Sequence, residues 1–258
     1  MKKILLNSLT LAVLSAGTAW AADMPVKAPI LKAPPPAAFS WDSVYVGGEV
    51  GYGWSRKDWN QTASFFGFPG PVPAFALDQV RVETRGGLAG GDFGFLRQTG
   101  TWVWGMEFNW DAADIKGTRA SVLNPAFFGR SQIDWMATLA GRVGFTVWDR
   151  GLIYAKGGLA VADESHQVLV GGAGVTNRAE QTRKGFVIGA GYEHAFANNL
   201  SAKLEYNFLD FGSRTSELRF FGPPVGLVED WRIRQEVHTF KVGLNWHFWP
   251  LAPVVAKY

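Results

Sequence analysis

The sequence contains 258 residues, no cysteine, and a formal net charge of +3. Without cysteine the chain can form neither a disulfide framework nor the lipid-modified cysteine of a lipoprotein. Lys2 and Lys3 would leave with a signal peptide and lower the charge to +1 (3 − 2), so the basic balance does not indicate a nucleic-acid-binding surface.

The first 21 residues have the three parts of a secretory signal peptide. Lys2 and Lys3 form the basic part, residues 4–16 form the apolar part, and residues 19–21 provide a small-x-small cleavage site, so we expect the mature chain to start near Ala22. An anchoring helix is the alternative, but the apolar run is shorter than the roughly 18 to 20 residues that cross a bilayer. No later apolar run is long enough for a membrane-spanning helix, so a secreted chain that stays in a membrane must be a closed barrel.

Residues 22–40 are rich in proline and alanine and predict an extended, polyproline-like periplasmic segment. An arm that contacts the peptidoglycan wall is the alternative for this segment. Residues 41–248 are predicted to form one barrel domain, and residues 249–258 a C-terminal periplasmic extension.

Alternation of apolar and polar residues predicts eight strands. The alternation is clearest where Trp102, Trp104 and Met106 share one face and Val103 and Glu107 share the other. In chain order the predicted strands cover residues 44–55, 84–98, 102–111, 133–147, 152–163, 186–193, 200–208 and 236–248. In the fourth strand the alternation places Ile133 and Trp135 on the outer face together.

The connections between these strands are alternately long and short. Outer-membrane barrels have this rhythm because short turns face the periplasm and long loops face the outside. The twelve Trp and nineteen Phe residues suit the aromatic girdles of such barrels. We therefore predict an all-β fold, an eight-stranded antiparallel up-and-down transmembrane β-barrel in the cell outer membrane, with both termini on the periplasmic side.

The last predicted strand carries a polar residue, a glycine and two aromatic residues at set positions: Lys241, Gly243, Trp246 and Phe248. This pattern resembles the C-terminal insertion signal of outer-membrane barrels. The resemblance implies that the barrel-assembly machinery is a partner during insertion.

Motifs along the rest of the chain point to one family. They include Trp41, Tyr45, Gly47, Gly48, Gly51, Tyr52, Gly53 and Trp54, then Gly86, Gly87, Gly90 and Gly91, then Gly141, Arg142 and Gly144, then Tyr154, Ala155, Gly157 and Gly158, then Gly189, Gly191 and Tyr192, and finally Leu204, Glu205 and Tyr206. The chain resembles the small outer-membrane barrel family of alphaproteobacteria, which is related to the OmpA-like transmembrane domain. The resemblance implies an abundant integral outer-membrane protein with surface-exposed loops and a structural or porin-like role.

If the apolar face of each strand meets lipid, a set of charged side chains faces the lumen. The set is Glu49, Asp92, Glu107, Arg142, Lys156, Glu193, Lys203, Glu205 and Lys241. The interior of an eight-stranded barrel is about wide enough for side chains to fill, so these charges must be paired or hydrated. One interpretation is an ionic network that closes the lumen; the alternative is a gate in which Arg142 or Lys241 exchanges partners to open a narrow water path.

The sequence predicts no catalytic, metal-binding or cofactor-binding site. None of the four histidines has a serine and a carboxylate at a spacing typical of a hydrolase, and Ser165 and His166 point to opposite faces of a strand. Near Phe196 and Phe248, His194 and His247 are predicted to be interfacial residues. No phosphate-binding loop is present.

Arginine and lysine residues recur in the segments predicted to lie outside the membrane. They are Arg81, Arg85, Arg119, Arg130, Arg178, Arg183, Lys184, Arg214, Arg219, Arg232 and Arg234. Guanidinium groups match phosphate geometry, so we expect some of them, with Arg183 and Lys184 as the candidates, to contact lipopolysaccharide. Ordinary solvated loop charge, balanced by nearby acidic residues, is the alternative.

Taken together, these patterns favour an integral outer-membrane protein with a mainly structural role in membrane integrity and surface exposure. A small porin-like pore for ions and small solutes is the first alternative. Surface adhesion through the loops is the second, because aromatic residues such as Phe65, Phe66, Phe127 and Phe220 are expected there.

Overall fold

The computed structural model describes residues 39–65, 79–120, 127–170, 174–219 and 228–248. The predicted signal peptide, most of the proline-rich segment and the C-terminal extension lie outside the described residues. The described residues contain no helix long and apolar enough to cross a membrane.

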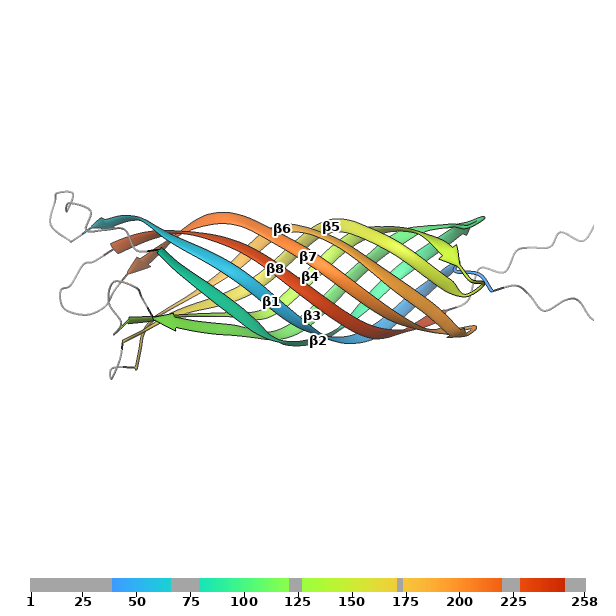
Figure 1. The fold of residues 1–258 in the computed structure, drawn as a ribbon, viewed down its shortest axis with the longest axis horizontal. Helices are drawn as coiled ribbons and strands as arrows, with labels where there is room; N and C mark the ends of the chain where they lie inside the picture. The colour runs from blue at the N-terminus through green and yellow to red at the C-terminus, as the bar shows by residue number, and fades with distance from the viewer. Residues whose placement is uncertain (1–38, 66–78, 121–126, 171–173, 220–227, 249–258) are drawn as a thin grey trace, which may run out of the picture. The chain divides into compact units, whose positions relative to one another are not determined.

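Eight antiparallel strands close into a barrel in sequence order, and β8 pairs with β1 (Figure 1). This confirms the predicted fold. The strands are β1 (Ser43–Phe65), β2 (Gln79–Thr99), β3 (Trp102–Ala120), β4 (Phe127–Val147), β5 (Gly151–Val170), β6 (Gly174–Ala197), β7 (Leu200–Arg219) and β8 (Val228–Phe248).

The strands are longer than predicted. On β1 the pairing with β8 continues to Phe65 opposite Val228, whereas the sequence pattern had ended the strand at Ser55. The strands therefore include residues 56–65, 79–83, 164–170, 174–182, 212–219 and 228–235, which the sequence pattern predicts as connections. Alternation reports a contrast between two environments, and beyond the lipid both faces of a strand can be polar while its backbone hydrogen bonds continue.

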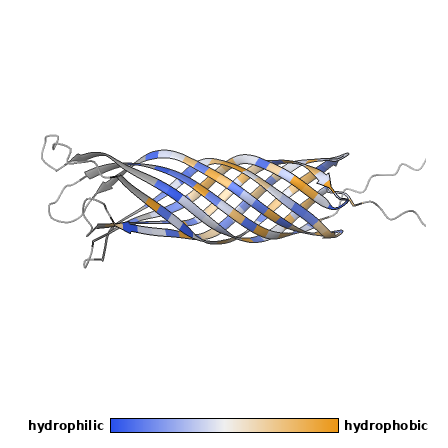
Figure 2. Cartoon of the chain, in the orientation of Figure 1, coloured by the Kyte–Doolittle hydropathy of each residue, from blue (hydrophilic) through white to orange (hydrophobic). Residues whose placement is uncertain are grey.

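Large apolar side chains cover the outside of one part of the barrel, and Figure 2 shows hydrophobic and hydrophilic residues alternating along its strands. Trp104, Phe108 and Trp246 are each about half exposed on this surface. We call it the apolar belt; it covers residues 44–54, 87–95, 102–112, 135–147, 151–161, 186–196, 202–208 and 238–248. A surface of this kind needs a hydrocarbon environment.

The two ends of the barrel differ. The short turns at 100–101, 148–150 and 198–199 lie at the same end as the start of β1 and the end of β8. In outer-membrane barrels this end faces the periplasm. Gly100 adopts φ +61° in the first turn, a conformation that a residue without a Cβ adopts at little cost.

A bulge changes the predicted orientation of one residue on β4. The pairing of β4 with β5 shifts between Ile133 and Trp135, so these two residues no longer share a face. Ile133 is fully buried inside the barrel. Its predicted outward orientation was wrong, because strict alternation assumes a strand without an inserted residue.

Candidate functional site: the closed lumen

From the periplasmic end, the first three layers of side chains inside the barrel lie one above another. On β3 they follow one another along a single row of inward residues: Val103, then Glu107 and Asp111, then Ile115. Apolar layers therefore lie on both sides of an ionic one. We call them the periplasmic plug, the ionic layer and the outer apolar layer.

The ionic layer contains all nine charged residues that the sequence places in the lumen, and every one of them is buried. Asp111 joins them although it was not included in the predicted set. The sequence does indicate its inward position, because Asp111 alternates with Trp110 in the same way as Glu107 alternates with Phe108. The layer thus holds six carboxylates against four permanent cations.

Arg142 on β4 connects opposite sides of the ionic layer. Its Nη1 donates to Glu107 Oε2 at 2.9 Å and to Tyr45 Oη at 2.7 Å, and its Nη2 donates to Glu193 Oε2 at 2.8 Å. The guanidinium also lies 3.8 Å from the centre of the Tyr154 ring, within cation–π range. These contacts hold the side chain from four directions.

Three lysines complete the network. Lys156 Nζ lies 2.8 Å from Glu107 Oε1 and 2.7 Å from Glu205 Oε1. Lys203 bridges Glu49 at 2.8 Å and Asp92 at 3.0 Å, while Lys241 contacts Glu49, Asn109 and Asp111. Every cation has at least two partners, which is the arrangement that a buried charge requires.

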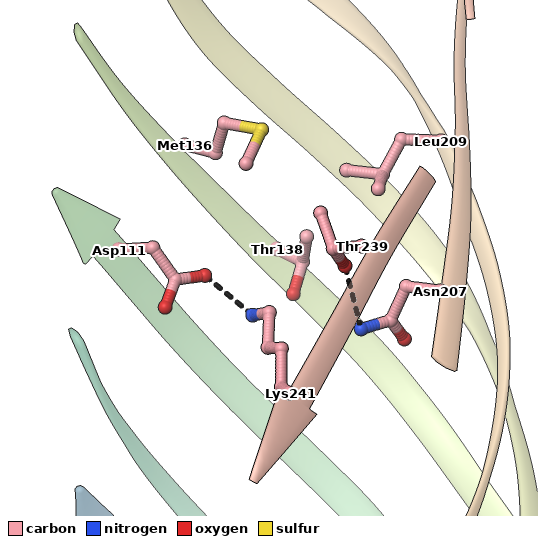
Figure 3. Close-up of a pocket in the computed structure, with 7 residues that line it drawn as sticks. All are labelled: Asp111, Met136, Thr138, Asn207, Leu209, Thr239 and Lys241. Carbon is pink, nitrogen blue, oxygen red and sulfur yellow. Dashed lines mark hydrogen bonds and ion pairs between the residues drawn. The ribbon is translucent and has the colours of Figure 1, made fainter. Parts of the chain in front are cut away.

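The outer apolar layer lies directly above the ionic layer. It consists of Leu88, Ile115, Ile133, Met136, Ala140, Ala160, Ala162, Val187, Leu209, Phe211 and Val237. Figure 3 shows the boundary between the two layers, where Met136 and Leu209 lie across a small cavity from Asp111 and Lys241. The cavity has room for about one water molecule, so it interrupts the packing without opening a passage.

The periplasmic plug closes the other side. Trp41 lies inside the mouth of the barrel with Leu96, Val103 and Leu152, and Phe39 meets its ring edge-on at 5.1 Å. The backbone N–H of Trp41 donates to Gln98 Oε1 at 2.8 Å, which ties the chain before β1 to the end of β2. The plug was not recognised from the sequence because Trp41 precedes the alternating part of the strand.

His247 lies at the boundary between the plug and the ionic layer. Its Nδ1 is 2.9 Å from Ser43 Oγ and its Nε2 is 2.8 Å from Ser201 Oγ, while Glu193 Oε1 accepts from Ser201 at 2.5 Å. The predicted interfacial position of His247 was therefore wrong: it shares the inward face with Lys241. His194, in contrast, is exposed and lies beside Tyr192.

This group brings together a serine, a histidine and a carboxylate that are far apart in the sequence. The contact between Ser43 and His247 spans 204 residues, so spacing could not have revealed it. Both serines and the histidine are buried beneath Trp41, whose ring lies 5.7 Å from that of His247. The described residues contain no group of three or more metal-ligating side chains.

A further polar group lies inside the barrel beyond the apolar belt. Lys57 Nζ contacts Ser131 Oγ at 2.6 Å and Glu164 Oε2 at 3.2 Å, and Arg183 Nε lies 3.4 Å from the same carboxylate oxygen. Burial lowers the pKa of Lys57 from its ordinary value, and the Glu164 carboxylate opposes that shift.

Arg183 corrects the prediction of a lipopolysaccharide contact. Its side chain is fully buried inside the barrel, whereas that of Lys184, the next residue, is exposed on the outside. Successive residues of a strand point to opposite faces, so Arg183 and Lys184 cannot both meet lipid. The contact stays a prediction for Lys184 alone.

The four residues of the predicted insertion signal divide between the two faces of β8. Trp246 and Phe248 are exposed in the apolar belt, and Lys241 belongs to the ionic layer. A Cβ added at Gly243 would lie 3.0 Å from both the Glu49 Cβ and the Lys203 Cε, so a side chain there would crowd the lumen. Recognition by the assembly machinery stays a prediction.

Comparison with known proteins places this fold and location in context. The family model of the outer membrane protein beta-barrel domain matches residues 10–248. The 31 kDa outer-membrane immunogenic protein of Brucella melitensis is 28% identical over 96% of this chain and 100% of its own. The 22 kDa outer membrane protein of Rhizobium leguminosarum bv. viciae is 27% identical over 72% of each chain.

Solved structures support the fold alone. The outer membrane protein OprG of Pseudomonas aeruginosa aligns with a TM-score of 0.53 at 9% identity, and the outer membrane protease OmpT of Escherichia coli with 0.52 at 7% identity. Each alignment covers 83% of this chain and 99% of the other. The apolar belt and the relatives agree on an outer-membrane location, and the protein belongs to the outer membrane protein beta-barrel domain family.

Proposed function

We propose that this outer-membrane protein has a structural role, as a sealed barrel that crosses the membrane without conducting. The observation that carries the proposal is the layered lumen. An ion that crossed the barrel would have to displace the Trp41 plug, separate ion pairs in the ionic layer, and pass an apolar layer that offers it no partners.

The size of the barrel supports the same conclusion. Eight strands enclose an interior that side chains can fill, and here large side chains such as Tyr45, Met136 and Tyr154 do so. A gate at Arg142 would need simultaneous loss of its contacts with Glu107 and Glu193. A barrel with a structural role keeps these contacts at all times.

Surface exposure is the second part of the proposal. The strands continue well past the apolar belt, so the barrel itself extends beyond the lipid on the extracellular side. The Brucella relatives carry the name outer-membrane immunogenic protein, which supports surface-exposed segments for this chain as well. We do not propose catalysis, because the serines beside His247 are buried and provide hydrogen-bond partners for its two ring nitrogens.

Single-channel recording tests the sealed lumen. The purified protein, shown to be folded by its heat-modifiable gel mobility, is added to planar lipid bilayers, with a general porin as the positive control. We expect the porin to produce conductance steps and this protein to produce none. Reproducible steps from the folded protein would favour the porin-like alternative and refute the structural proposal.

A further inference from the structure

The first charged residue that faces outward beyond the apolar belt differs from strand to strand. In order from β1 to β8 these residues are Arg56, Arg85, Asp114, Asp134, Asp163, Lys184, Asp210 and Glu236. Acidic residues hold this position on five strands. Cations hold it on β1, β2 and β6, and β1 and β2 are the two neighbouring strands on which cations stand side by side at the lipid boundary.

Arg85 has a second cation on its other side. It pairs in register with Trp54 of β1 and with Lys116 of β3, and both Arg85 and Lys116 are exposed. Like charges directly opposite each other on two strands destabilise a sheet slightly. Arg85 also makes no hydrogen bond or ion pair to another residue that the structure describes, so its five donors are available to a ligand.

Carboxylates lie beside the neighbours of Arg85, whereas Arg85 forms no ion pair with a described residue, although Glu83 shares its outward face two residues away. Lys116 forms an ion pair with Asp114 at 2.7 Å, and Arg56 lies in register with Glu83. Both partners of the Lys116 pair are about half exposed, and such surface pairs are weak. Lys116 therefore keeps donors for an additional anion.

A strip without large side chains lies directly below Arg85 on the same strand. The next outward residues of β2 are Gly87, Ala89 and Gly91. Gly91 lies opposite Gly48 and Ala89 opposite Ala112, while Tyr52, Val50 and Trp110 are the other register partners and flank the strip. The outer surface therefore offers a narrow apolar path that starts at a cation and runs into the belt between larger side chains.

A second pair of outward glycines provides a comparison. Gly141 and Gly157 are register partners on β4 and β5 and are both exposed. The first outward charges above this pair are Asp134 and Asp163, so it combines a small-residue surface with the opposite charge. Among the residues that the structure describes, only the face of β1–β3 joins a cation to such a strip.

We propose that the outer face of β1–β3 binds a phosphorylated lipid of the outer leaflet, the lipid A part of lipopolysaccharide. Its phosphate lies between Arg85 and Lys116, and one acyl chain lies along Gly87, Ala89 and Gly91. A guanidinium and an ammonium both make charge-assisted hydrogen bonds with phosphate oxygens. Trp54, opposite Arg85, marks the head-group level at which such a phosphate stands. This inference does not depend on whether the lumen conducts.

The charge part is tested by titrating detergent-solubilised, folded protein with bisphosphorylated lipid A and counting bound lipid by native mass spectrometry. The double variant Arg85→Gln/Lys116→Gln should bind roughly tenfold more weakly, as expected for the loss of two charged contacts at a partly exposed site. Lys184→Gln is the matched control, because Lys184 occupies the same boundary between Asp163 and Asp210 on the neighbouring strands. Because those two carboxylates disfavour a phosphate there, this variant should bind within about twofold of the wild type, which runs against the contact predicted from the sequence for Lys184.

The strip is tested without changing any charge. In Gly87→Leu the new Cβ has only the Gly51 carbonyl oxygen nearby, at 4.0 Å, so the barrel tolerates the change while the side chain fills the path. The control Gly157→Leu meets the Val187 carbonyl oxygen at 3.8 Å and fills the other glycine pair. We expect severalfold weaker lipid A binding for Gly87→Leu and unchanged binding for Gly157→Leu.

Heat-modifiable gel mobility confirms that each variant is folded. If the double variant does not fold, Arg85→Lys, which keeps the charge, provides a milder variant. Equal losses in Lys184→Gln and in the double variant would overturn the proposal, because they would show diffuse attraction. Undiminished binding by the double variant, or equal binding of dephosphorylated lipid A, would also overturn it. Equal affinity for phosphatidylglycerol would show that the site takes any anionic lipid and that lipid A is the wrong occupant.

Discussion

Replacing Arg142 by methionine removes the cation that joins Glu107 to Glu193 across the lumen while keeping a side chain of similar length. Glu107 keeps Lys156 at 2.8 Å, but Glu193 loses its only close permanent cation and is left with Ser201, Asn245 and His247. Removing one partner of a buried ion pair costs about 3–5 kcal/mol. We expect Arg142→Met to lower the free energy of unfolding by that amount.

The measurement is urea unfolding of the protein reconstituted in lipid vesicles, followed by tryptophan fluorescence. Arg97→Met is the matched control, because Arg97 is exposed on β2, and surface substitutions of this kind change stability by less than about 0.5 kcal/mol. A loss below about 1 kcal/mol for Arg142→Met would refute the view that the ionic layer is a tightly coupled network.

A second substitution separates charge from packing. In Arg142→Met/Glu193→Gln the buried carboxylate is neutralised together with its cation, so the double variant should be more stable than Arg142→Met alone, by about 1–3 kcal/mol of coupling. If the stability losses of Arg142→Met and of Glu193→Gln, measured separately, simply add in the double variant, the cost of Arg142→Met comes from packing.

Three further predictions concern the lumen and the sheet. Gly86→Ala should destabilise the barrel by about 1–3 kcal/mol, because the new Cβ collides with a backbone carbonyl of β3, whereas Gly157→Ala, with open space outside, should be neutral in the same urea titration. Trp41→Ala should cost about 3–5 kcal/mol, since it empties the periplasmic plug; an unchanged midpoint would show that the plug adds nothing. The double variant Met136→Ala/Leu209→Ala removes side-chain volume from the outer apolar layer. Any conductance that it gains should favour potassium over chloride, because the ionic layer holds more carboxylates than cations. A preference for chloride in a salt gradient would contradict this.

The parts of the fold that touch lipid could be predicted from the sequence. Alternation on β3 and β8 identifies which side chains face outward, because lipid and lumen are unlike environments and a residue such as Trp104 or Phe240 suits only one. The same alternation places Arg142 and Glu107 inside. Their partners could not be predicted, because alternation gives the face of the strand on which a residue lies and not its position around the barrel.

Two features could not be predicted from the pattern and a third was misread, for separate physical reasons. The bulge beside Ile133 leaves no mark on the apolar pattern, since an isoleucine suits either lipid or a packed interior. Arg183 is predicted to lie in or near the outer segments, because alternation fades there although β6 continues. His247 was placed by its aromatic neighbours along the chain, although parity with Lys241 pointed inward.

The ionic layer also has a consequence for how the barrel reaches its native pairing. Lys241 of the last strand contacts Glu49 of the first, 192 residues away, so this bond forms only when the ring has closed. A slip of one residue in any strand would turn its lumenal charges toward hydrocarbon, where each ion is poorly tolerated. The buried charges therefore disfavour barrels in which a strand has slipped by an odd number of residues, and they do so more strongly than an apolar filling of the same volume would.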